Sequence, residues 1–158
     1  MADSNESLEI ELSDSEKDRV IDKIKKIVNC GNYTEDWTYS VNNIKNQKFR
    51  ETYICGEEEY KKVINKLSKE NFYEAERNNS TKAKYDARLA KQIMYKFIVK
   101  EIFVLRCPED EDEKKISVYV KITFAYDCDE SVIIVSFHES LRSLEEELEN
   151  KMKAKGQN

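Results

Sequence analysis

Two neighbouring segments decide the fold: Ser117-Val-Tyr-Val-Lys-Ile-Thr-Phe-Ala-Tyr126 and Val132-Ile-Ile-Val-Ser-Phe-His138. β-Branched and aromatic residues dominate both segments, which is typical of strands, and the acidic residues between them fit a short loop. Strands joined by a short loop pair in the antiparallel sense. The two segments therefore predict a hairpin that places Tyr119, Lys121 and the only histidine of the chain, His138, on adjacent strands.

A third strand is expected before this hairpin. Residues 94–107 are again rich in β-branched and aromatic side chains, and the charged pair Lys100-Glu101 marks a place where the strand can bend. The acidic run at residues 109–113 predicts a solvated loop. Three strands in succession, over residues 94–107, 116–126 and 132–137, predict an antiparallel meander.

A helix is predicted over residues 14–29. Ser13-Asp-Ser-Glu16 has the pattern of a capping box, in which the serine and the glutamate satisfy free backbone N–H groups at a helix start. Apolar residues then recur at helical spacing, and Gly31 is a residue that commonly ends a helix. The apolar face of this helix is expected to cover the sheet.

The remaining elements are shorter. Helices are expected near residues 39–45, from residue 56 to residue 67 and, capped by Ser68, over residues 69–77. The alternation in residues 8–12 predicts a short strand at the end of an acidic arm, residues 1–12. Residues 139–154 form a helical extension, whose apolar positions are Leu141, Leu144, Leu148 and Met152. Helices first and strands afterwards predict an α+β fold in one domain, residues 1–158.

Composition narrows the class of protein. The four cysteines, Cys30, Cys55, Cys107 and Cys128, lie far apart, so a reduced protein without metal or cofactor is expected. No run of eighteen apolar residues and no signal-peptide pattern occurs. The sequence therefore predicts a soluble, cytoplasmic protein with no membrane segment.

Charge is unevenly distributed along the chain. The net charge is −5, but residues 17–107 carry 20 Lys and Arg against 13 Asp and Glu. Residues 1–16 hold six acids and no base, and residues 108–158 hold 7 bases and 13 acids. A nucleic acid responds to the potential within about one Debye length, roughly 8 Å, so a basic face can bind RNA on an acidic protein.

The chain resembles the MqsR family of toxin-antitoxin mRNA interferases, which belong to the RelE-like superfamily. Residues 25–31 are similar to the family's Lys-Lys-Leu-Val-Asn-x-Gly, and residues 63–73 to its Val-Ile-x-x-Leu-Ser-x-x-Asp-Phe-Tyr. Residues 91–95 stand where the family has Trp-Gln-Asp-Val-Tyr, and residues 118–137 match its closing strands. The resemblance implies a RelE-like domain, a metal-independent endoribonuclease that cleaves mRNA, and inhibition by an antitoxin, with growth arrest when the toxin is free. A zinc-binding antitoxin with a helix-turn-helix domain is the kind of partner that it implies.

In the family, catalysis is attributed to two lysines, a glutamine and a tyrosine. Carried over by position, the glutamine is Gln92 and the tyrosine is Tyr119. The lysine after the Phe-Tyr pair becomes Glu74, and the lysine after Val-Ser-Phe becomes His138. The chain therefore keeps two positions and departs at two.

The reaction implied by the resemblance needs a base for the RNA 2′-hydroxyl, a cation for the phosphorane and an acid for the 5′-oxygen. Histidine can act as acid or base because its pKa lies near neutrality. We therefore take Tyr119, His138 and Gln92 as the candidate catalytic residues. The cations expected to bind the substrate are Lys121, Lys91, Arg88 and Lys96.

Each of these residues also has an ordinary structural explanation. A histidine or a tyrosine in a strand can simply pack or face solvent, and a run of basic residues can be a solvated face. A second interpretation of the whole chain follows from Glu74 and from the negative net charge. In this reading the protein is a catalytically weakened relative that binds a protein, such as an antitoxin.

Overall fold

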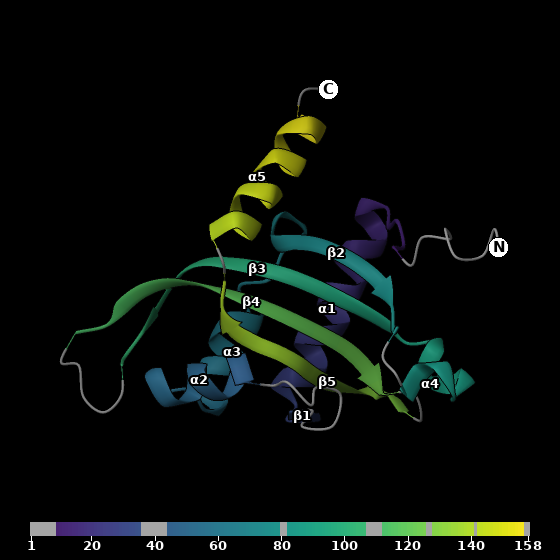
Figure 1. The fold of residues 1–158 in the computed structure, drawn as a ribbon, viewed down its shortest axis with the longest axis horizontal. Helices are drawn as coiled ribbons and strands as arrows, with labels where there is room; N and C mark the ends of the chain where they lie inside the picture. Colours follow the sequence, from purple (N-terminus) through teal and green to yellow (C-terminus); the bar gives the residue numbers. More distant parts are fainter. Residues whose placement is uncertain are drawn as a thin grey trace.

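The computed structural model describes residues 9–35, 44–79, 82–106, 112–125, 128–140 and 142–156 (Figure 1). Its centre is a twisted five-stranded sheet with the order β1-β5-β4-β3-β2. The strands are β1 (Tyr33–Glu35), β2 (Phe72–Arg77), β3 (Ile93–Val104), β4 (Lys114–Ala125) and β5 (Cys128–Glu139). The helices are α1 (Asp14–Asn29), α2 (Ile44–Thr52), α3 (Glu57–Ile64), α4 (Ala87–Ala90) and α5 (Arg142–Gly156). The predicted α+β class is confirmed.

The predicted three-strand meander is confirmed. β3, β4 and β5 are consecutive and pair in the antiparallel sense, with β2 antiparallel on the outer side of β3. β3 is irregular where a bend was expected, because its register with β4 shifts between Val99 and Ile102 and Glu101 has φ of 62°. A positive φ is uncommon for a residue with a side chain, so the irregularity is built into the strand.

Three features of the strands differ from those that the sequence predicts. β1 pairs with β5 in the parallel sense, so the sheet is mixed and not wholly antiparallel. Residues 69–77 are not one helical turn, because a short 3₁₀ helix over Lys69–Asn71 is followed by the edge strand β2. In the segment 8–12, the described residues form a single bridge, between Glu9 and Glu76. They form no strand of greater length.

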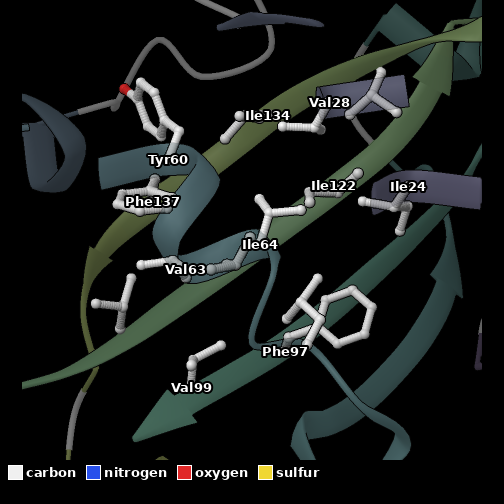
Figure 2. Close-up of a cluster of buried hydrophobic side chains, with 14 of the residues drawn as sticks. Ile24, Val28, Tyr60, Val63, Ile64, Phe97, Val99, Ile122, Ile134 and Phe137 are labelled. Carbon is white, nitrogen blue, oxygen red and sulfur yellow. The ribbon is translucent and has the colours of Figure 1, made fainter. Parts of the chain in front are cut away.

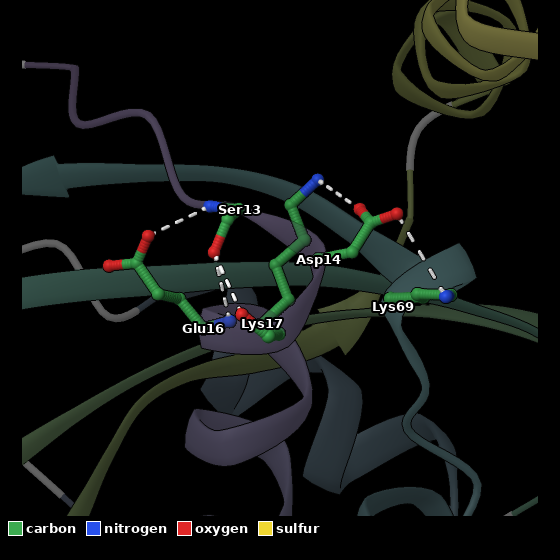
Figure 3. A network of polar contacts seen from close by, with 6 residues as sticks. Ser13, Asp14, Glu16, Lys17 and Lys69 are labelled. Atoms are coloured by element: carbon green, nitrogen blue, oxygen red, sulfur yellow. Dashed lines mark hydrogen bonds and ion pairs between the residues drawn. The ribbon is translucent and has the colours of Figure 1, made fainter.

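The first helix begins as expected. Ser13 Oγ accepts a hydrogen bond from the Glu16 backbone N–H, and the Glu16 carboxylate accepts one from the Ser13 N–H (Figure 3). Lys17 and Lys69 both lie 3.9 Å from Asp14, which ties this helix start to the 3₁₀ turn before β2. The Asp14–Lys69 ion pair thus links the start of α1 to the segment that precedes the edge strand β2.

The helices α1, α2 and α3 cover one face of the sheet (Figure 1). Figure 2 shows Ile24 and Val28 of α1, Val63 and Ile64 of α3 and Phe97 of β3 in one buried cluster, the main core. All five side chains are at most 1% exposed. We call the opposite face of the sheet the open face; in Figure 1, α5 begins beside β3 and β2 and projects away from the sheet.

The helical boundaries are the least accurate predictions. α3 ends at Ile64 and not at residue 67, and the terminal helix covers 142–156 in place of 139–154. The helix expected near 39–45 falls largely outside the described residues, and α2 begins at Ile44. On α5, Leu148 is buried and Met152 is 41% exposed, whereas Leu141 and the side chain of Leu144 lie outside the described part.

Candidate active site

The open face takes its side chains from alternate positions of the central strands. Val118, Val120 and Ile122 of β4 are buried in the main core. Because successive side chains of a strand point to opposite faces, Tyr119 and Lys121 lie on the open face. In the sheet, His138 of β5 is directly opposite Tyr119, and Lys96 of β3 is directly opposite Lys121. The structure therefore brings four of the predicted site residues together.

A bulge at Val135 decides where His138 lies. Ile122 pairs with Ile134 but Lys121 pairs with Ser136, so Val135 is an extra residue in β5. The buried Asn46 side chain of α2 holds this place, donating from Nδ2 to Val135 O (3.0 Å) and accepting at Oδ1 from the Phe137 N–H (2.9 Å). A bulge of one residue reverses the faces of the residues that follow it. His138 therefore joins Tyr119, and Phe137 enters the core.

Tyr119 and His138 form the centre of the site. Their rings are 5.2 Å apart between centroids and tilted by 32°. His138 Nδ1 is 3.0 Å from Glu139 O, so the Nδ1–H donates this bond and Nε2 keeps its lone pair. Burial lowers the pKa of His138 below 6.5; the hydrogen bond to Glu139 O opposes this decrease, and the charge of Lys45 reinforces it. The imidazole is therefore neutral at pH 7 and able to accept a proton.

The pKa of Tyr119 is shifted in the opposite direction, upward. Burial raises the pKa of the Tyr119 hydroxyl above 10; the charge of Lys96 opposes this increase, and Glu74 and Glu76 reinforce it. The hydroxyl is therefore protonated at neutral pH and can donate a hydrogen bond or a proton. A base and an acid on facing strands are the pair that general acid–base catalysis requires.

Lys121 is a half-buried cation beside this pair. Burial lowers the pKa of its ammonium, the positive charge of Lys96 acts in the same direction, and the charges of Glu76 and Glu74 oppose the decrease. No hydrogen bond or ion pair joins Lys121 to any residue within the described ranges. A partly buried charge without a partner is costly, so this ammonium is well suited to receive an anion.

Lys96, in contrast, is fully engaged. Its Nζ lies 2.7 Å from a carboxylate oxygen of Glu74 and 2.7 Å from one of Glu76, and all three side chains are less than a quarter exposed. Burial lowers the pKa of Lys96, but the hydrogen bonds to Glu74 and Glu76 outweigh it and the pKa is raised. The three groups carry a net charge of −1. Lys96 is therefore not positioned as a free phosphate-binding cation, which was its predicted role.

α5 forms one wall of the site. Ile98 of β3 is directly opposite Tyr119 in the sheet. Ile98 is fully buried and Leu148 of α5 is buried as well, although neither belongs to the main core. Lys100 of β3 binds Glu149 of α5, and Lys151 donates to Tyr73 O at 3.1 Å. The helix therefore covers the β2 and β3 side of the open face next to Tyr119.

The other predicted site residues lie at a different place. Phe124 is five positions beyond Tyr119, about 16 Å along β4. Gln92 is buried against Phe124: its Nε2 donates to Phe124 O (3.0 Å), and its Oε1 accepts from Asn78 Nδ2 (3.1 Å). The structure therefore does not bring Gln92 into contact with Tyr119 or His138, and both ends of its amide are engaged.

Arg88, Lys91 and Gln92 share a pocket of about 340 Å³ with Tyr95, Thr123 and Phe124. This pocket lies where β3 begins and β4 ends. Arg88 also pairs with Asp86, with 3.3 Å between Nη2 and Oδ2. The predicted basic residues are therefore real neighbours of one another, at the end of the sheet away from Tyr119 and His138.

Sequence reasoning missed Glu76, Asn46 and Ser136. The alternation of Glu74 and Glu76 was a strand signal, but the segment was assigned to a helical turn. Ser136 lies beside Lys121 only because of the bulge, and no local pattern marks Asn46 as the residue that holds it.

Three further observations concern metal ligands, thiols and membrane-spanning helices. In the part of the chain that the structure describes, no three His, Cys, Asp or Glu side chains are grouped so that they could hold a metal ion. Cys30 and Cys55 are free thiols. Within the same ranges, no helix combines the length and apolar character needed to cross a bilayer.

Comparison with known proteins does not extend these observations. No protein-family model matches the chain, and neither a curated protein nor a solved structure shows a significant match to it.

Proposed function

We propose that the protein is a metal-independent endoribonuclease, a toxin of the MqsR-like type that cleaves mRNA in the cytoplasm and is inhibited by an antitoxin. The observation that supports this best is that Tyr119 lies opposite His138, with 5.2 Å between the ring centroids. Lys121 lies beside them and has no ion-pair partner among the described residues. A neutral imidazole, a protonated phenol and a half-buried ammonium are the three groups that RNA transesterification needs.

In the proposed reaction, His138 Nε2 accepts the proton of the RNA 2′-hydroxyl. The 2′-oxygen attacks the adjacent phosphorus and a new P–O bond forms. The bond from phosphorus to the 5′-oxygen breaks, and the Tyr119 hydroxyl protonates the departing oxygen. Lys121 neutralises the charge that develops on the phosphorane. The products are a 2′,3′-cyclic phosphate and a free 5′-hydroxyl.

A second candidate is a protein-binding module without catalytic activity. The feature that favours it is the Glu74–Lys96–Glu76 group, which puts a net negative charge on the open face where a phosphate would arrive. Such a module would hold an antitoxin or another protein and would leave RNA intact.

Tyr119→Phe tests the proposal with the smallest change. We expect single-turnover cleavage of a labelled transcript in EDTA to slow by about 10²-fold or more, because the ring remains and only the proton donor is lost. Tyr33→Phe is the matched control, since it removes the hydroxyl of a tyrosine that packs against Tyr60 on the helix-covered side of the sheet. No cleavage by the parent protein, with the fold intact by circular dichroism, would instead support the binding module.

Glu74→Gln tests how the acidic group affects RNA. The change removes one negative charge beside Lys96 and Lys121, so binding of a short RNA at low salt should tighten by about fivefold, the effect of about 1 kcal/mol. The gain should shrink as salt screens the charges. Glu58→Gln removes an exposed carboxylate of α3, which covers the other face of the sheet, and should change little. Equal effects of the two substitutions would show that RNA does not approach Glu74.

A further inference from the structure

The connection between β2 and β3 has features that the catalytic proposal does not use. Residues 82–92, which we call the basic connection, contain four basic residues and one acidic residue in a chain of net charge −5. They form a 3₁₀ helix over Lys82–Lys84 and the short helix α4, which Figure 1 shows beside the end of β4 and the start of β5. The local charge is therefore opposite to that of the whole protein.

Tyr85, in the middle of the basic connection, has a solvent-exposed ring. Its side chain is 88% exposed, the highest value among the large apolar side chains of the described residues. No ring contact, hydrogen bond or ion pair engages it in that part of the chain. An aromatic ring in water forgoes burial that is usually worth about 2 kcal/mol, and an exposed ring is the group on which an unpaired base stacks.

The cations around Tyr85 are arranged for a polyanion. Lys84 and Lys91 are exposed and have no ion-pair partner among the described residues. Asp86 caps α4 by accepting from the Arg88 N–H at 2.9 Å and also binds the Arg88 side chain, so the only carboxylate of the segment is engaged. The backbone that carries Tyr85 is fixed by this cap.

The basic connection lies farther along β4 from the candidate active site, toward the other end of the sheet. Lys91 and Arg88 line the pocket that includes Thr123, which lies two positions beyond Lys121 on β4. Two residues span about 7 Å along a strand, and Tyr119 is about 13 Å from Thr123. A strand of RNA that follows β4 away from Tyr119 therefore reaches Arg88 and Lys91.

We propose that the basic connection binds single-stranded RNA, with a base stacked on Tyr85 and flanking phosphates at Lys84 and Lys91. This rests on RNA being the substrate, as proposed above, and adds a docking element outside the catalytic pair. A single strand fits because stacking on Tyr85 needs an unpaired base, whereas a duplex or an acidic peptide would use only the charges. Such binding is tolerant of sequence, because every base has a π-face.

The test measures binding separately from cleavage. A fluorescent 2′-O-methyl oligouridylate lacks the attacking hydroxyl, so its affinity reports docking alone. Tyr85→Ala should weaken its binding about 5- to 100-fold, the range for loss of one stacked base, and Tyr85→Phe should bind as the parent. Phe103→Ala, which removes another exposed aromatic side chain on β3, should have no effect.

Charge is tested by salt dependence. Replacing both Lys84 and Lys91 by alanine should reduce the slope of log K against log salt by about 1.4, since each phosphate contact on a single strand contributes about 0.7. The control replaces Lys26 and Lys66, which are exposed and unpaired within the described ranges but lie on α1 and after α3. The control slope should match the parent.

The outcomes separate the two proposals. Suppose that the parent binds the oligouridylate, that Tyr85→Ala weakens this binding, and that no RNA is cleaved. The docking element then stands and the catalytic proposal fails. If the parent cleaves RNA and Tyr85→Ala binds as tightly as the parent, the docking element is refuted. Equal weakening of heparin and oligouridylate binding by Tyr85→Ala would also refute it, because heparin offers charge without a base to stack.

Discussion

His138→Ala should slow RNA cleavage by about 10²- to 10⁴-fold while RNA binding is largely retained. The reason is that the imidazole supplies the proton acceptor, whereas the phosphate is held by Lys121 and by cations elsewhere on the surface. The measurement is single-turnover cleavage of a labelled transcript in EDTA, with binding measured in parallel. Ser136→Ala is the control, because it alters the neighbouring open-face position of β5 and leaves His138 opposite Tyr119.

The pH profile should carry the signature of the same group. Burial lowers the pKa of His138 below 6.5, and only the neutral imidazole accepts a proton. Cleavage should therefore be constant near pH 7 and fall as the pH drops through this lowered pKa. Added imidazole should restore part of the activity of His138→Ala. Full activity in His138→Ala, or an unchanged acidic limb, would remove His138 from the mechanism.

Phe97→Ala should lower the free energy of unfolding by about 3–5 kcal/mol. Phe97 is fully buried in β3 and meets Phe72 edge-to-face with 5.9 Å between ring centroids. The substitution leaves a cavity between the sheet and the helices, and the loss is a large part of the roughly 5–15 kcal/mol that stabilises an ordinary domain. Urea unfolding followed by circular dichroism measures it.

Phe103 offers a matched control on the same strand. It is 45% exposed, so Phe103→Ala removes the same atoms from β3 with much less loss of buried surface. We expect a change below about 1 kcal/mol. Similar losses for Phe97→Ala and Phe103→Ala would contradict the placement of the core between the sheet and α1 and α3.

Strong local patterns were sufficient for the main elements. Ser13 and Glu16 form the capping box that their spacing predicted, and Ile24 and Val28 of the same helix are fully buried. The three strands of the meander were found because β-branched residues dominate each of them over several positions. These signals lie within single elements, so they can be read without knowledge of the rest of the chain.

Weak or long-range signals were misread. β1 has three residues and is a strand only because it pairs with β5, about a hundred positions later. β2 was predicted as a helical turn because Ser68 can cap a helix there, yet Glu74 and Glu76 bind Lys96 of the neighbouring strand. Both elements depend on a partner that their own sequence does not reveal.

The sequence by itself determined that Tyr119 and Lys121 share one face of β4, because alternation within one strand is a local property. It did not determine that His138 joins them. Strict alternation would put His138 on the same face as Ile134, which is buried in the core. Only the bulge at Val135, held by the Asn46 side chain of α2, turns His138 to the open face. The tertiary structure decided this point because the hydrogen bonds that fix the bulge come from a helix some ninety residues away in the chain.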